Sequence, residues 1–149
     1  MFEATATMGG IEIQLAYYRG YGEFKAAPWA AEAKVLQNRM TSIRCAAGQT
    51  QIARVLKHAL GQARSAQSSV SALVFVGDCM EEDPDQLAKL AGELGILDVP
   101  TFLFQDGADP TAAKTFSHIA KLTRGAHCRF DGNSAAQLRD LLCAVAVYA

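Results

Sequence analysis

A carboxylate at the end of an apolar run is the residue in this sequence best placed for chemistry. Leu73 to Val76 are continuous, apolar and rich in β-branched and aromatic side chains, which predicts a strand buried on both faces. Asp78 follows after a single glycine. In an open parallel sheet, ligands bind in the crevice beyond the carboxyl ends of the strands. We therefore expect any functional site to lie near Asp78.

An acidic loop follows Asp78 and contains Glu81, Glu82 and Asp83. Mg²⁺ takes oxygen ligands and is commonly held by one or two carboxylates plus water, so the loop is a candidate cation site. The alternative is structural, with Asp83 capping a helix that opens at Pro84 and with both glutamates solvated. We favour the structural interpretation for the last three acids, because the helix dipole stabilises a carboxylate at a helix N-terminus without a metal.

A threonine at a predicted helix start is the second candidate. Thr50 precedes an apolar stripe of helical period that runs from Ile52 to Ala63. Its hydroxyl is either a helix N-cap or a metal ligand delivered at the start of the helix. The sequence alone favours the cap.

Cys79 is the thiol next to the predicted site. A nucleophilic cysteine needs a base beside it in the fold, and the sequence permits His118 or His127 without indicating either. Neither G-x-G-x-x-G nor G-x-x-x-x-G-K-[ST] occurs, so nucleotide chemistry has little support.

The elements that must position these residues alternate along the chain. Alternating apolar residues over 11–18, a glycine-containing turn at 19–22 and a short run over 23–26 predict a β-hairpin. Beyond it we expect helices over 31–41, 52–63, 84–94 and 110–120, strands over 73–76, 99–104 and 127–130, and a final helix opened by a capping box at 134–137. Strands separated by helices imply an α/β fold with a mostly parallel sheet covered on both faces.

Composition limits the classes of function. The 149 residues suit one domain, and the net charge of -1 provides no field that would attract nucleic acid or an anionic membrane. The four cysteines form no C-x-x-C pair, which favours a reducing cytoplasm. The N-terminus lacks the features of a secretory signal, and the longest unbroken apolar stretch, 141–149, is shorter than the ~20 residues of a membrane helix.

Taken together, these pieces resemble the von Willebrand factor type A domain, in its bacterial cytoplasmic branch. The resemblance covers the strand and turn at 11–20, the helix start at 48–52, the strand ending in Val76-Gly77-Asp78, the strand at 99–104 and the strand and helix at 127–148. It implies a Rossmann-like, three-layer fold with a mostly parallel sheet and an antiparallel edge hairpin. It also implies a protein-binding function.

The family builds a metal-ion-dependent adhesion site from three loops, which carry Asp-x-Ser-x-Ser, a threonine and an aspartate. By resemblance, Thr50 takes the second role and Asp78 the third. No Asp-x-Ser-x-Ser occurs here, the family's first, central strand has no counterpart, and Cys79 stands where the family usually has glycine. One hydroxyl and one carboxylate are too few ligands to hold Mg²⁺ against its hydration, so we expect weak or absent Mg²⁺ binding.

The missing strand would separate the strand at 11–18 from the strand at 73–76. We expect the gap to be filled by a second copy of the chain, by a strand donated from another chain, or by closure of the sheet. The leading hypothesis is one cytoplasmic domain over 1–149, truncated at its N-terminus, that binds a protein partner and is not an enzyme. The alternative is a small divalent-metal-dependent hydrolase or phosphotransfer domain that uses Asp78 with Glu81 or Glu82. A third is that Met1 is an internal methionine of a longer reading frame.

Overall fold

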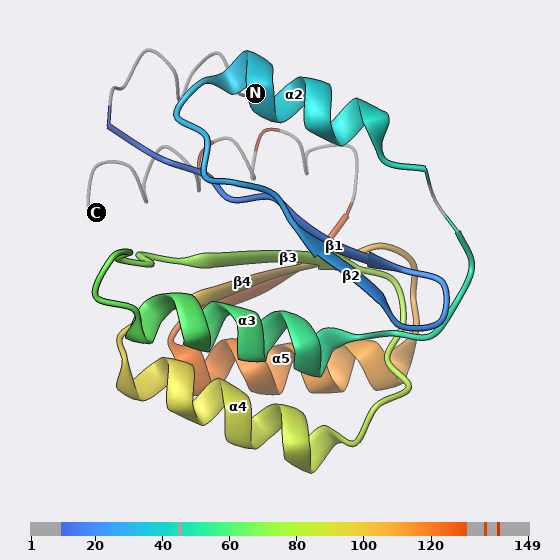
Figure 1. Cartoon of the computed structure of the whole chain (residues 1–149). Helices are drawn as coiled ribbons and strands as arrows, with labels where there is room; N and C mark the ends of the chain where they lie inside the picture. The colour runs from blue at the N-terminus through green and yellow to red at the C-terminus, as the bar shows by residue number, and fades with distance from the viewer. Residues whose placement is uncertain (1–9, 45, 131–135, 137–139, 141–149) are drawn as a thin grey trace. The chain divides into compact units, whose positions relative to one another are not determined.

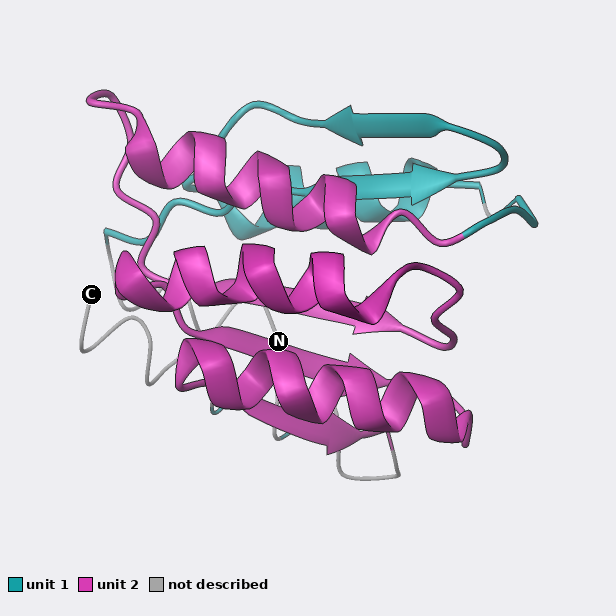
Figure 2. Ribbon diagram, turned by 90° about the horizontal axis from the view of Figure 1, so that it is seen from below, with its two compact units in different colours: residues 1–49, 132–149 teal, residues 50–131 magenta. Residues whose placement is uncertain are grey.

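The chain divides into two compact units in a computed structural model that describes residues 10–44, 46–130, 136 and 140 (Figures 1 and 2). Unit 1 comprises residues 1–49 and 132–149, and unit 2 comprises residues 50–131. Both predicted metal ligands, Thr50 and Asp78, therefore belong to unit 2. The predicted capping box at 134–137 lies outside the described residues except for position 136.

Unit 1 contains the predicted hairpin. Strands β1 (Ala16–Arg19) and β2 (Glu23–Ala26) pair antiparallel, and helix α2 (Ala33–Ser42) follows them. The first strand is shorter than the alternation of apolar residues predicts, because Ile13 forms only an isolated bridge with Ala30.

Charged side chains hold the end of the hairpin together. The Arg19 Nε donates to Glu23 Oε2 at 2.6 Å, and Lys25 Nζ lies 3.0 Å from Glu23 Oε1. The hydrogen bonds from Arg19 and Lys25 lower the pKa of Glu23 to about 2. The edges of this hairpin therefore carry a dense set of charges.

Unit 2 is a parallel sheet with helices on one face. Its elements are α3 (Ile52–Arg64), β3 (Leu73–Gly77), α4 (Pro84–Ile96), β4 (Thr101–Gln105), α5 (Pro110–Thr123) and β5 (Ala126–Arg129). The strand order is β3-β4-β5, with both pairs parallel. Seen from below, α3, α4 and α5 lie side by side in front of the strands (Figure 2). These elements match the predicted ones to within a few residues.

The core of unit 2 lies between the sheet and its helices. The rings of Phe75 on β3 and Phe116 on α5 meet edge to face, with centroids 5.5 Å apart. Both rings are buried. Leu103 on β4, which pairs with Phe75 on β3 and with a residue of β5, is buried as well. Gly95 lies where α4 meets α5, and a Cβ there would collide with the carbonyl oxygen of Leu122. Helices α4 and α5 thus approach each other closely through their backbones at Gly95.

The other face of β3 differs from the prediction. The sequence predicts burial on both faces, but the side chain of Val76 is 51% exposed. Alternate residues of a strand face opposite sides, so Val76 lies on the face opposite to Phe75 and the helices. An apolar run indicates a strand, but it does not establish that both faces are covered.

The α/β class, the parallel sheet and the antiparallel hairpin are as predicted. Within the described residues, β1 pairs only with β2 and β3 pairs only with β4, so the hairpin and the parallel sheet are two separate sheets.

Candidate functional site

Asp78 lies where the sequence places it, at the carboxyl end of the parallel sheet. It directly follows β3 and is exposed. The Asp106 amide donates to the Gly77 carbonyl at 2.9 Å, which extends the pairing of β3 and β4 by one residue. The loops after β3 and β4 therefore start next to each other at this end of the sheet.

Thr50 is buried against the loop after β3. Its side chain is only 9% exposed, and its Oγ1 accepts a hydrogen bond from the Glu81 amide at 3.3 Å. The prediction that Thr50 caps α3 is wrong, because the N-cap residue is Gln51 and makes no side-chain capping bond. The structure does bring Thr50 to the acidic loop that carries Asp78.

The cap of α3 comes from Glu82, a role that the sequence did not suggest. Its two carboxylate oxygens accept from the amides of Ile52 at 2.5 Å and Ala53 at 2.9 Å. The prediction that Glu82 is solvated is therefore wrong. The favourable interaction of a carboxylate with a helix N-terminus still holds, but the helix is α3 and not the nearby α4. The sequence contains no local signal of this cap, because Thr50 stands before the helix as a ready capping residue and Glu82 lies 30 residues from Ile52.

These contacts leave few ligands for a metal ion. Glu82 is engaged by two amides, and the Thr50 hydroxyl already accepts a hydrogen bond. Within the residues that the structure describes, no three His, Cys, Asp or Glu side chains are grouped so that they could hold a metal ion. Of the two predicted ligands, Asp78 is exposed at the end of β3, and Thr50 is buried and hydrogen-bonded to the loop.

The thiol of Cys79 is held in its protonated form. Burial raises its pKa to about 11, together with a hydrogen bond to Asp78 and the negative charges of Asp78, Glu81 and Asp109. The thiolate is the nucleophilic form of cysteine, so this environment disfavours reactivity at neutral pH. It is the opposite of the electropositive setting that activates a catalytic cysteine.

A buried glutamine joins the ends of β4 and β5. Gln105 is fully buried, its Nε2 donates to the Asp109 carbonyl at 2.8 Å, and its Oε1 lies 3.1 Å from His127 Nε2. Burial and the charge of Arg129 lower the pKa of His127. Its ring also meets Phe116 edge to face at 6.0 Å. These contacts favour a packing role for His127, and sequence reasoning did not single out Gln105.

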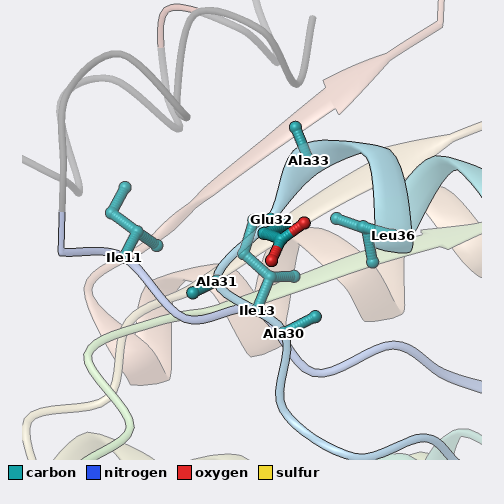
Figure 3. A pocket seen from close by; sticks show the side chains of 7 residues that line it. All are labelled: Ile11, Ile13, Ala30, Ala31, Glu32, Ala33 and Leu36. Atoms are coloured by element: carbon teal, nitrogen blue, oxygen red, sulfur yellow. The ribbon is translucent and has the colours of Figure 1, made fainter.

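Two hollows lie within unit 1. A small pocket beside the start of α2 has a volume of about 10 Å³, room for about one water molecule (Figure 3). It is lined by Ile11, Ile13, Ala30, Ala31, Glu32, Ala33 and Leu36. A more open groove of about 320 Å³ is lined by Leu15, Tyr17, Lys25, Ala26, Ala27, Arg39, Ser42 and Ile43. Neither hollow includes Thr50 or Asp78.

The parallel sheet, its helical layer and the antiparallel hairpin define a von Willebrand A-like α/β fold. Among solved structures, the chain is similar to an aerotolerance-related membrane protein from Bacteroides fragilis, crystallised with multiple mutations to serines. The TM-score is 0.72 and the sequence identity 12%, over 98% of this chain and 85% of that chain. At this identity the likeness is one of fold.

Comparisons of the sequence with protein families and with curated proteins found no match. Among the described residues, no helix has both the length and the apolar character needed to cross a membrane.

Proposed function

We propose that this chain is a protein-binding module of the von Willebrand A type with an incomplete metal-ion-dependent adhesion site. The observation that carries the proposal is that the two predicted metal ligands differ in exposure and in hydrogen bonding. Asp78 is exposed at the carboxyl end of β3, whereas Thr50 is buried and hydrogen-bonded to the loop. The site therefore offers a partner one exposed carboxylate, which suits a basic or amide-donating protein surface.

The second part of the proposal is that the module does no chemistry of its own. The alternative, a hydrolase or phosphotransfer domain, needs Asp78 to act with Glu81 or Glu82, with or without Cys79. The Glu82 carboxylate is already engaged by the start of α3, and the Cys79 thiol is protonated at neutral pH. Both observations support a binding role over a catalytic one.

The third part concerns metal and location. We expect the isolated chain to bind Mg²⁺ weakly or not at all, because one carboxylate and one hydroxyl are too few ligands to hold the ion against its hydration. We also place the protein in the cytoplasm, and the free thiols of Cys79 and Cys128 support a reducing compartment.

A melting experiment tests the metal prediction. Wild-type protein and Asp78→Ala are heated with EDTA and with millimolar Mg²⁺. A ligand that binds only the folded state raises the melting temperature. Since we expect little or no Mg²⁺ binding, the melting temperature of both proteins should be the same with Mg²⁺ as with EDTA. A rise of several degrees in the wild type that is absent from Asp78→Ala would show that Mg²⁺ is bound at Asp78.

Affinity capture tests the binding role. The tagged chain, Asp78→Asn and the matched control Asp85→Asn are exposed to a lysate of the source organism in the presence of EDTA. Asp85 is an exposed acid in the first turn of α4, so both variants lose one surface charge. We expect a partner that is retained by the wild type and the control and lost by Asp78→Asn.

Equal retention by all three proteins would refute a binding site at Asp78. A panel of phosphate and carboxylate esters, assayed with divalent metals, examines the catalytic alternative. Turnover by the wild type that disappears in Asp78→Ala would replace the binding proposal with that alternative.

A further inference from the structure

The larger hollow of unit 1 is a groove between the β1–β2 hairpin and the C-terminal part of α2, called the hairpin groove below. Its volume of about 320 Å³ falls within the ~300–1,000 Å³ that is usual for sites of small organic ligands. All of its described lining residues belong to unit 1, whereas Asp78 belongs to unit 2. The groove is therefore separate from the site proposed at Asp78.

One face of the hairpin forms the first wall of the groove. Tyr17 on β1 pairs with Lys25 on β2, and the Ala27 amide donates to the Leu15 carbonyl at 2.8 Å. Residues two apart on a strand face the same side, so the two cross-strand pairs lie next to each other on one face. This wall combines apolar side chains and an aromatic ring with one ammonium group.

Helix α2 forms the second wall. Arg39 and Ser42 are three residues apart and are neighbours on the helix surface, and Ile43 directly follows the helix. The Arg39 Nη1 donates to the Pro28 carbonyl at 2.6 Å, which ties the guanidinium to the segment between the hairpin and the helix. A guanidinium has five N–H donors, and this bond uses one of them.

The hairpin groove has positive charge without a matching acid. The charged side chains that line it are Lys25 and Arg39, and no Asp or Glu is among its described lining residues. Glu23 lies 3.0 Å from Lys25 Nζ, but its two oxygens also accept from Arg19 Nε at 2.6 Å and Nη2 at 3.1 Å. That bidentate pair already balances the charge of Glu23, so the charge of Lys25 is in excess. Within the part of the chain that the structure describes, no carboxylate pairs with Arg39.

We propose that the hairpin groove binds a small organic acid, a carboxylate attached to an aliphatic or aromatic body. Lys25 and Arg39 attract the carboxylate and can donate charge-assisted hydrogen bonds to it. Leu15, Ile43 and the ring of Tyr17 provide apolar contacts for the body. A neutral ligand would gain only the apolar contacts, and a cation would be repelled. The volume, at the lower end of the usual range, favours a compact ligand over a segment of a protein.

An NMR titration of the ¹⁵N-labelled full chain tests the proposal. Octanoate and benzoate are the two probes, and octanamide is the neutral analogue of octanoate. We expect at least one of the two acids to bind saturably at millimolar concentrations or below, with shifts at the amides of Tyr17, Lys25 and Ile43. Octanamide should bind at least ~tenfold more weakly than octanoate, because it lacks the charge that Lys25 and Arg39 attract.

Variants identify the residues that hold the carboxylate. Lys25→Gln and Arg39→Gln each remove one cation from the groove. The matched control is Lys34→Gln, because Lys34 is an exposed lysine of α2 that does not line the groove. We expect ~tenfold weaker binding of the acid by each groove variant and unchanged binding by the control. Arg39→Lys keeps the charge and should bind more tightly than Arg39→Gln.

Three results would each overturn the proposal: no saturable binding of either acid, equal affinity for octanoate and octanamide, or an equal loss of affinity in Lys34→Gln and the two groove variants. If Arg39→Gln does not fold, Lys25→Gln decides, because its side chain is 58% exposed and its replacement leaves the pair of Arg19 and Glu23 in place. Asp78→Asn should bind the acid as the wild type does, which separates this site from the binding role of Asp78.

Discussion

The helices of unit 2 begin in two different ways. Helices α4 and α5 are each capped by the residue just before them: Asp83 accepts from the Asp85 amide at 3.0 Å, and Asp109 accepts from the Ala112 amide at 2.8 Å. Helix α3 is instead capped by Glu82, which lies 30 residues from Ile52 in the sequence. A local cap stabilises its own helix, whereas the cap from Glu82 also fixes α3 to the loop at the carboxyl end of β3. The two kinds of cap should therefore differ in their effect on stability.

The largest effect is expected at Glu82. Glu82→Ala removes a charged acceptor from two helix amides and releases α3 from the loop after β3. Hydrogen bonds to a charged group contribute ~2 kcal/mol, so the free energy of unfolding should fall by about that amount. Urea unfolding followed by circular dichroism measures the change.

Glu81→Ala is the matched control for that experiment. Glu81 is the exposed neighbour, and only its backbone amide contacts Thr50, so its truncation should change stability by less than ~0.5 kcal/mol. Equal losses in the two variants would show that the charge of the loop matters and that the cap does not.

A smaller effect is expected for the local cap of α5. Asp109→Ala should lower the free energy of unfolding by ~1 kcal/mol, the usual value for an N-cap carboxylate. Asp109→Asn keeps a capping oxygen and should retain most of the stability in the same urea titration. A loss for Asp109→Ala larger than that for Glu82→Ala would reverse the ranking of local and distant caps.

The smallest effect concerns Cys79, in the loop that delivers Glu82. Its pKa of about 11 lies above the ordinary value of 9.0, so the folded state retains the thiol proton where the unfolded state loses it. The contribution of this group to stability is therefore complete below pH 9.0 and is lost as the pH rises toward about 11. At neutral pH, Asp78→Asn should leave stability nearly unchanged.

The reactivity of Cys79 should nevertheless respond to that substitution. Asp78→Asn removes a negative charge from beside the thiol, so the pKa of Cys79 should move down while burial keeps it above its ordinary value. Mass spectrometry of iodoacetamide-treated protein across a pH series follows the alkylation of this one residue. An unchanged alkylation profile would mean that burial alone sets the pKa.

The contrast between local and distant helix caps also explains which features the sequence could predict. The Asp-Pro pairs at 83–84 and 109–110 mark helix starts because the cap and the helix are neighbours in sequence, and the structure places both helices there. Apolar runs and periodicities likewise located the hairpin and the strands and helices of unit 2. These features depend on local backbone preferences and on the period of burial.

The parts that the sequence did not predict all depend on tertiary contacts. The position of Thr50 just before a helix predicts a capping role, but its hydroxyl accepts from the Glu81 amide. The positions of Glu82 and Gln105 follow from which loops meet at the carboxyl end of the sheet. The exposure of Val76 depends on what covers the second face of β3. A local pattern contains none of this information.

The contact at Gly95 has a further consequence for the helical layer. The Gly95 carbonyl also accepts from the Arg124 side chain, at 3.1 Å from Nη2, so a side-chain hydrogen bond is added to the close backbone approach of α4 and α5. The backbone approach at Gly95 freezes no rotamers, whereas Arg124 loses side-chain entropy when it forms its hydrogen bond. The spacing of the two helices at this point is thus limited by backbone at Gly95, where a Cβ would collide with the carbonyl oxygen of Leu122.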